Sequence, residues 1–307
     1  MGNAFGWHQN QHSRVPSTRL LCYYDVLNKI LVKVALHPRE FAEVTMACPA
    51  IKDIPKDVIV IYDRGFASYA VLYLHMFYGS NCIIRLKKDF NPTVVAFLKS
   101  RAPELLVETP MPERATRCLR KLGHKVSRKD TIRYRLIRVE LPNGEVEVLM
   151  TSLLHRRKYH RRHFAGLYNS RWGVETCFHI LKSYFQAAVF ASYTNESIRQ
   201  EVWAMFALFN LQSMCQFALE KQVGQKTQGR KYAYQLNRNV GLGYLKRFLP
   251  ALLLDGPKRW WARVKELLAL LLSVLEPIRT DKNRVRKKGL MRGAERHIYE
   301  PNYKPSL

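Results

Sequence analysis

The sequence predicts an α/β fold in which helices cover a mixed sheet. Three patterns support this: an apolar run at Val58–Tyr62, a hairpin pattern at Thr18–Leu36, and an amphipathic pattern at Leu167–Phe185. The apolar run has the composition of a strand buried on both faces of a sheet. The chain has 307 residues, 47% of them hydrophobic, so it is long enough to bury a large core.

The charge of the chain points to an anionic partner. Lysine and arginine number 51 against 24 acidic residues, which gives a net charge of +27. Such an excess strains a compact fold unless an anion is bound, so nucleic acid is the expected partner. A basic membrane-surface protein is the rival class. No membrane association is expected, because the sequence shows no convincing lipidation signal or amphipathic anchor and its longest aliphatic run, Leu267–Leu275, is too short to span a bilayer.

Cysteine usage and the amino-terminal residues indicate a cytoplasmic protein. The first twenty residues lack the apolar core of a signal peptide. Six widely separated cysteines show no zinc-site spacing, and we expect reduced thiols, mostly in the core: Cys22, Cys48, Cys82, Cys118, Cys177 and Cys215.

The first part of the chain reads as alternating strands and helices. Residues 1–17 are polar and unpatterned, and residues 18–36 predict a hairpin broken near Asp25–Asn28. A short helix is expected over Arg39–Ala47. After the apolar run we expect a helix over residues 67–78 and a strand over residues 81–86.

Asp63 directly follows the apolar run, in the block Asp63-Arg64-Gly65-Phe66. A carboxylate at the carboxyl end of a central strand lies where open α/β sheets bind ligands. An Asp at this position can also be a turn residue or a helix cap. A ligand-binding role and a structural role of Asp63 therefore both remain open.

Residues 89–163 predict a β-rich subdomain inserted into the main fold. Strands are expected at Glu104–Thr109, Arg133–Leu141 and Glu145–Leu154, the last two joined by the turn signal Pro142-Asn143-Gly144. We therefore divide the chain into a first core part (1–88), the insertion (89–163), a helical second core part (164–280) and a basic tail (281–307). The second core part contains two further expected helices, over Ser197–Lys221 and Lys258–Leu275.

A basic cluster, His155–His163, ends the expected insertion. It is placed to neutralise phosphates, although a localisation signal or a solvated loop would have the same composition. Its histidines show no chelating pattern. Its cations are Arg156, Arg157, Lys158, Arg161 and Arg162.

The segment Leu167–Phe185 predicts one helix with a polar edge. At about 100° per residue, Tyr168, Arg171, Glu175 and Lys182 fall within a wedge of roughly 60°, opposite an apolar stripe. A solvated face with Glu–Lys pairing is the ordinary explanation.

The spacing Tyr-x2-Arg-x3-Glu-x6-Lys, with Trp172-Gly173 inside it, resembles the signature of insertion-sequence transposases of the DDE type. The block at Asp63 resembles the one that carries the second catalytic Asp in that family, and Gly229–Arg238 resembles the tail of its catalytic domain. The resemblance implies a ribonuclease H-like fold with a β insertion.

The same resemblance assigns roles to the site residues. Asp63 and Glu175 would be catalytic ligands of Mg²⁺, and Tyr168, Arg171 and Lys182 would hold transposon-end DNA. Arg64 and the cations of the basic cluster are expected to join the DNA contacts. The resemblance also suggests a homodimer on paired ends and a prokaryotic, nucleoid-associated location.

The first catalytic Asp of the family is not found in this sequence, and we expect its strand to be missing. Asp25 is a weaker candidate for that role. Two hypotheses follow: a transposase, or the carboxyl-terminal portion of one, that cleaves and joins DNA, or an inactive remnant that binds DNA or full-length transposase as an inhibitor. A basic nucleic-acid-binding protein unrelated to transposition would require both blocks to be accidental.

Overall fold

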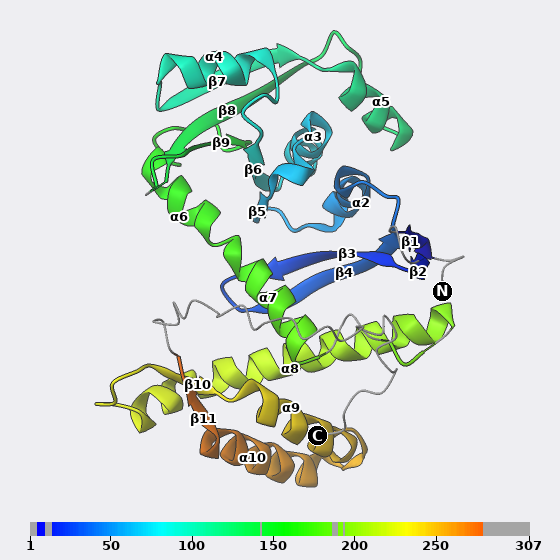
Figure 1. Ribbon diagram of the computed structural model, residues 1–307, viewed down its shortest axis with the longest axis vertical. Helices are drawn as coiled ribbons and strands as arrows, with labels where there is room; N and C mark the ends of the chain where they lie inside the picture. Colours follow the sequence, from blue (N-terminus) through cyan, green and yellow to red (C-terminus); the bar gives the residue numbers. More distant parts are fainter. Residues whose placement is uncertain (1–4, 10–13, 142, 186–189, 193, 279–307) are drawn as a thin grey trace, which may run out of the picture. The chain divides into compact units, whose positions relative to one another are not determined.

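The computed structural model describes residues 5–9, 14–141, 143–185, 190–192 and 194–278 (Figure 1). Residue contacts divide the chain into two compact units. Among the described residues, those from 5 to 21 and from 35 to 173 form one, which we call the sheet unit. Those from 22 to 34 and from 174 to 278 form the other, the helical unit. The basic tail predicted from Asp281 onward lies outside the described residues.

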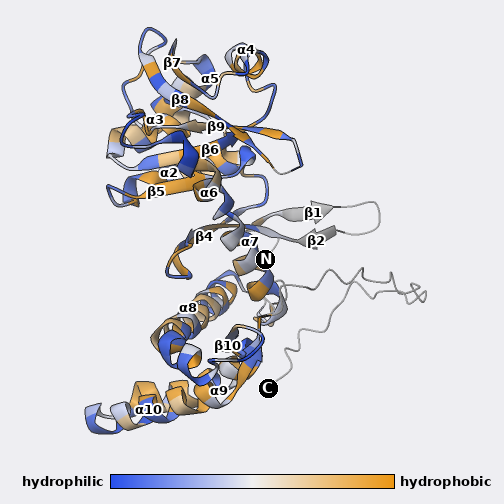
Figure 2. Ribbon diagram, turned by 90° about the vertical axis from the view of Figure 1, so that its left-hand side faces the viewer, coloured by the Kyte–Doolittle hydropathy of each residue, from blue (hydrophilic) through white to orange (hydrophobic). Residues whose placement is uncertain are grey.

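The sheet unit is built on one five-stranded mixed sheet with the order β5-β6-β9-β8-β7. β5 and β6 are parallel, with Ile59 opposite Asn81, and the other neighbouring pairs are antiparallel. β5 carries the hydrophobic colour along most of its length in Figure 2. The expected mixed sheet with flanking helices is confirmed. Its strands are β5 (Ile59–Tyr62), β6 (Asn81–Leu86), β7 (Glu104–Pro110), β8 (Thr131–Glu140) and β9 (Val146–Thr151).

The strands of the expected insertion belong to the same sheet as the strand before Asp63. β9 pairs with β6, with Met150 opposite Ile84, and both residues are fully buried. Two helices of this region were not predicted: α4 (Pro92–Ser100) and α5 (Glu113–Lys121). The start of α4 had a sequence signal, because the Asn91 side chain accepts the Val94 N–H at 2.8 Å and Pro92 opens the helix.

Helices cover both faces of this sheet. α3 (Tyr69–Tyr78) and α6 (Phe164–Asn169) lie on opposite faces, because neighbouring residues of β5 point in opposite directions. Ile61 packs in the cluster that contains Phe164 and Tyr168 of α6, whereas the Tyr62 hydroxyl bonds Nε2 of His75 in α3 at 2.9 Å. We call these the α6 face and the α3 face.

His75 anchors α3 to the sheet through a buried polar network. Its Nδ1 also lies 2.7 Å from the Ser80 hydroxyl, and the side chain is fully buried. Burial lowers the pKa of His75 to about 3, so the ring is neutral at physiological pH.

The amino-terminal region contains two hairpins. β1 (Trp7–Gln9) pairs with β2 (Arg14–Pro16), where the sequence showed no pattern. The expected hairpin of residues 18–36 is confirmed as β3 (Thr18–Asp25) and β4 (Ile30–Pro38).

The helix expected over Arg39–Ala47 starts later than predicted. α2 spans Glu43–Ala50 and continues into the 3₁₀ turn η1 (Ile51–Asp53). Residue 42 supplies no capping side chain, and Glu43 places a carboxylate in the first turn, where the helix dipole favours it. Proline 38 therefore precedes a turn rather than the helix.

The helical unit packs three helices around a second core. α8 (Asn195–Lys226) contributes Leu219 and Val223 to a cluster with residues of α9 (Arg238–Leu254) and α10 (Pro257–Ser273). α9 was not predicted. The strands β10 (Tyr234–Leu236), before α9, and β11 (Leu275–Pro277), after α10, pair with each other. In the same unit, the Asn210 amide bonds both backbone groups of Leu31, at 2.8 and 2.9 Å.

α8 is also the one helix among the described residues whose length and composition would allow it to cross a bilayer. Core helices of globular proteins pass the same test, and α8 buries Phe206, Phe209 and Val202 in its own unit. All six cysteines are free, and Cys48, Cys82 and Cys177 are buried.

Candidate active site

Asp63 lies at the end of β5 with its carboxylate uncommitted to the turn that follows. The chain turns there into η2 (Arg64–Phe66), and the Asp63 backbone carbonyl accepts the Phe66 N–H at 3.0 Å. Asp63 occupies the cap position of this turn, but its side chain makes no capping hydrogen bond. The sequence left a ligand-binding role and a structural role open for Asp63. The structure excludes capping by its side chain.

Tyr168 of α6 points at that carboxylate from the covering helix. The Tyr168 hydroxyl donates to Oδ1 of Asp63 at 3.5 Å, and the tyrosine is buried. Burial raises the pKa of Tyr168 to about 12, with Asp63 adding to the rise and Arg171 opposing it. The phenol therefore stays protonated and acts as a donor at physiological pH.

The prediction of one continuous helix over Leu167–Phe185 is wrong. α6 ends at Asn169, and α7 spans Trp172–Ser183. Ser170 breaks the helix: its hydroxyl donates to the Leu167 carbonyl at 2.6 Å, and its N–H is shared between the carbonyls of residues 166 and 167. A serine hydroxyl that bonds a carbonyl of the preceding turn weakens the regular pattern of helix hydrogen bonds. As a result Tyr168 is buried beside Asp63 and does not share an exposed edge with Lys182.

Three arginines of the sheet unit lie near Tyr168 or directly after Asp63. The Arg171 guanidinium lies 5.7 Å from the centre of the Tyr168 ring and 5.1 Å from that of Trp172. Arg64 is exposed directly after Asp63, and Arg85 of β6 pairs with Glu147 of β9 at 2.9 Å. This end of the α6 face therefore combines the cations Arg64, Arg85 and Arg171 with a carboxylate that does not cap the turn.

Glu43 is a neighbour of the Asp63 block that sequence reasoning missed. A Cβ added to Gly65 would lie 1.6 Å from Oε2 of Glu43, so the carboxylate of α2 occupies the space above this glycine. The absence of a side chain at position 65 is what lets Glu43 approach. Nothing in the sequence signalled this contact, because the two residues are 22 positions apart.

The basic cluster is fixed to the sheet by a buried arginine. Arg135 of β8 pairs with Glu104 of β7, and its Nη1 donates to the Tyr159 carbonyl at 2.7 Å. Glu104 also accepts an ion pair from Arg156 at 3.3 Å, so Arg156 is partly committed to the fold. The remaining predicted cations are exposed: Arg157, Lys158, Arg161 and Arg162.

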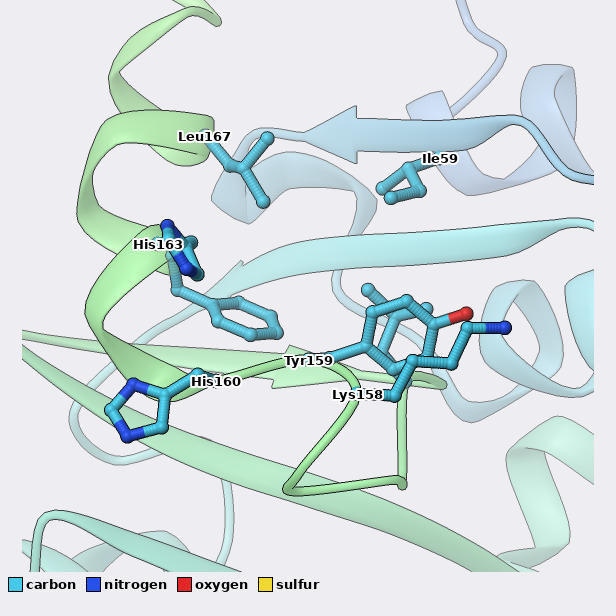
Figure 3. A pocket seen from close by; sticks show the side chains of 8 residues that line it. Ile59, Lys158, Tyr159, His160, His163 and Leu167 are labelled. Atoms are coloured by element: carbon cyan, nitrogen blue, oxygen red, sulfur yellow. The ribbon is translucent and has the colours of Figure 1, made fainter.

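A cavity of about 450 Å³ opens between this cluster and α6, at the other end of β5 from Asp63. Its floor is apolar, from Ile59, Leu153 and Phe164. Figure 3 shows Tyr159 and Leu167 facing Ile59, with Lys158 beside the Tyr159 ring. The cluster therefore combines exposed cations with an apolar recess.

Glu175 and Lys182 belong to the helical unit. Glu175 lies in the first turn of α7 and Lys182 in its last turn, and both are exposed. They are seven positions apart, which places them on one side of the helix. The apolar residues Cys177 and Leu181 are buried, as the predicted stripe requires.

The comparison with known families shows to which class of protein the chain belongs. Residues 3–211 match the family described as Transposase DDE domain, which is about two thirds of the chain. The chain belongs to the DDE transposase family. The mixed sheet with its flanking helices is consistent with the ribonuclease H-like fold of such a transposase domain. No curated protein matches the sequence.

The carboxylates expected at the site of this transposase domain are suitable ligands for a hard cation. Carboxylate oxygens are the ligands that Mg²⁺ prefers, and the Asp63 side chain is not consumed by capping. Among the described residues, however, no group of three or more His, Cys, Asp or Glu side chains is placed to share one metal ion.

Asp25, the weaker candidate for the first catalytic Asp, closes the β3–β4 turn. Its Oδ1 accepts the backbone N–H groups of Leu27 and Asn28 at 2.9 and 3.0 Å, and its Oδ2 accepts the Asn28 amide at 2.6 Å. Burial raises the pKa of Asp25, but the hydrogen bonds outweigh it and the pKa lies below its usual value. These contacts give Asp25 a structural role in this transposase.

Proposed function

We propose that this transposase cleaves DNA at the ends of an insertion sequence and joins the ends to a new site. The observation that carries the proposal is the Asp63 carboxylate, which is oriented by Tyr168 instead of capping the turn. It lies at the end of the strand where an α/β sheet binds ligands, among cations that suit a phosphate backbone.

Mg²⁺ is the proposed cofactor, held by Asp63 and Glu175. When bound in pairs, such ions activate the attacking hydroxyl and stabilise the leaving oxygen in phosphoryl transfer. The neutral Tyr168 hydroxyl restricts the rotation of the Asp63 carboxylate, and the buried ring limits water on that side.

DNA binding is assigned to cations around these carboxylates. Arg64 and Arg171 would contact phosphates next to Asp63, Arg171 with its planar fork. Lys182 would act in the same way beside Glu175. Further along the DNA, the exposed side chains of the basic cluster would hold the backbone: Arg157, Lys158, Arg161 and Arg162, with Arg156 contributing less because of its pair with Glu104.

We also propose a cellular location and an oligomeric state for this transposase. A protein that joins two transposon ends acts on DNA in the cytoplasm, at the nucleoid of a prokaryotic cell. Two copies on paired ends would form a homodimer.

The alternative function is an inhibitor without catalytic activity. The observation that favours it is the absence from this sequence of the block that carries the family's first catalytic Asp. Such a protein would bind transposon ends, or pair with an active transposase, without cutting.

One experiment separates the two functions. Purified protein is incubated with a supercoiled plasmid that carries the element's own ends, with Mg²⁺ or with EDTA, and nicked DNA is quantified. Asp63→Asn and Glu175→Gln are compared with Glu220→Gln, which removes an exposed charge of α8. The transposase predicts Mg²⁺-dependent nicking that falls by about 1,000-fold or more in the first two variants and is kept in the third. Wild-type protein that binds the ends in a salt-sensitive way but never nicks them would establish the inhibitor.

A further inference from the structure

The α3 face carries a group of aromatic rings between α3 and the segment after α5, in which Phe77 is exposed and the other three rings are half-buried. We call Tyr73, Phe77, Tyr78 and His124 the ring patch. Tyr73 and Phe77 are stacked, with centroids 5.9 Å apart and planes 20° apart, and Phe77 meets His124 edge-on at 4.8 Å. The Tyr78 hydroxyl lies 3.4 Å from Nε2 of His124. The four rings therefore form one connected surface.

This surface is more exposed than core packing would require. Phe77 is 58% exposed, and the neighbouring side chains Met76 and Leu122 are 39% and 37% exposed. The opposite side of α3 already supplies the core contacts, through Val71, Leu72 and Leu74. Neighbouring exposed apolar side chains of this kind are a feature of binding surfaces.

The segment that supplies His124 to the ring patch is rich in cations. Residues 113–130 contain seven lysines and arginines but two carboxylates. Glu113 pairs with Arg117 at 3.1 Å and Arg128 at 3.7 Å. Lys121 and Lys125, on either side of His124 in the sequence, are exposed and have no carboxylate partner in the part of the chain that the structure describes.

We propose that the ring patch binds an unpaired stretch of DNA, with bases stacked on Phe77 and its neighbours and phosphates held by Lys121 and Lys125. Exposed rings beside unpaired cations are the combination by which proteins bind single strands, because every base offers a π face and every linkage a negative charge. A protein partner would be attracted by the rings but not by the excess of positive charge. This inference rests on the proposed function in one respect: the proposed function identifies the bound polyanion as DNA.

The ring patch is a separate surface from the Asp63 site. It lies on helix α3, which the Tyr62–His75 bond fixes to one face of the sheet, whereas Asp63 meets Tyr168 on the other face. DNA on the ring patch is therefore a second segment and not the one contacted by Tyr168 and Arg171.

The test measures binding of a fluorescent oligothymidine of roughly 12 nucleotides, a length within the range that one single-strand binding site covers. Phe77→Leu keeps the exposed apolar volume but removes the ring, and about tenfold weaker binding is expected. Phe77→Trp should restore the affinity. A duplex of the same length should lose less than twofold with Phe77→Leu, because its bases are already stacked.

The charge contribution is tested separately. Lys121→Ala/Lys125→Ala should reduce the slope of log affinity against log salt by about 1.4 for the single strand. Lys258→Ala/Lys265→Ala is the matched control, since it removes two exposed lysines of α10. Photocrosslinking of an oligonucleotide that carries 5-iododeoxyuridine should label Tyr73, Phe77 or Tyr78.

Two results would overturn the inference. Wild-type affinity of Phe77→Leu for oligothymidine, with crosslinks confined to the basic cluster, would remove DNA from the ring patch. A change of oligomeric state in Phe77→Leu without a change in DNA binding would identify a protein interface instead. Neither result depends on nicking at the element's ends, so the proposed function and this inference can fail independently.

Discussion

The two faces of the five-stranded sheet use their cations differently. On the α6 face, Arg135 is buried against Glu104 and the Tyr159 carbonyl, and Arg85 is paired with Glu147. On the α3 face, Arg138 of β8 donates to backbone carbonyls of residues 97, 98 and 102 instead of pairing with a carboxylate. His75 is neutral there, and the lysines near the ring patch lie at the surface. A cation in the sequence of this protein therefore has one of two roles, holding the fold or binding an anion, and its partner determines which.

The largest expected effect is the difference in stability between a variant that breaks a buried ion pair and one that breaks an exposed ion pair. Arg133 and Arg135 are two positions apart on β8 and each pairs with a glutamate of β7, Arg133 with Glu108 at 3.2 Å. The side chain of Arg135 is 1% exposed and that of Arg133 69%. Arg135→Ala should lower the free energy of unfolding by about 3–5 kcal/mol, because Glu104 loses the partner that compensates its burial.

Arg133→Ala is the matched control and should cost less than about 1 kcal/mol. Urea denaturation followed by circular dichroism measures both. Equal losses in the two variants would contradict the assignment of a fold-holding cation to the α6 face.

The second effect tests the interior of the α3 face through pH. The pKa of His75 is about 3 in the folded protein, below the value of 6.5 for an ordinary histidine. The unfolded chain therefore binds the proton more tightly than the folded protein. The contribution of neutral His75 to the free energy of unfolding is complete above pH 6.5 and is lost as the pH falls toward 3. Between pH 7.5 and 5 the free energy of unfolding should fall by about 2 kcal/mol from this group.

His75→Gln removes this titration while keeping a neutral polar side chain. Denaturation curves at the two pH values should show a drop that is smaller by about 2 kcal/mol in the variant. An unchanged pH dependence would mean that His75 is protonated in the folded state.

The third effect distinguishes committed from available cations within the basic cluster. Arg161→Ala/Arg162→Ala should reduce the salt slope of duplex binding by about 1.8, since two phosphate contacts are lost. Arg156→Ala should reduce it by less than about 0.9, because Glu104 already engages that side chain. Anisotropy titrations with labelled duplex at several salt concentrations measure both. An Arg156 slope change as large as one full contact would show that its ion pair opens on DNA.

The smallest effect concerns the hydroxyl that meets Asp63. Tyr168→Phe keeps the buried ring but removes the donor at 3.5 Å, and Mg²⁺-dependent nicking should fall by about fivefold, or about 1 kcal/mol, because a hydrogen bond of this length is weak. Tyr159→Phe, whose ring lines the cavity, should nick at the wild-type rate. A loss in both variants would point to general destabilisation, which thermal unfolding would detect.

The sequence by itself determined the elements with strong local patterns. The Val58–Tyr62 strand, the hairpin of residues 18–36 and the strand at 81–86 follow from composition and turn residues, because a short strand with apolar neighbours is specified locally. The family was likewise readable from two blocks of residues, and the match of residues 3–211 confirms it.

Only the tertiary structure decided how the site is built. The break at Ser170 depends on a side chain that competes with the helix backbone, and a 100° periodicity plot does not register that competition. The turn that buries Tyr168 against Asp63, the approach of Glu43 to Gly65 and the pairing of Arg135 with Glu104 join residues 22 to 105 positions apart in the chain. Whether a charged residue of this protein binds DNA or holds its sheet together depends on such long-range contacts, because burial and pairing set the cost of leaving a charge free.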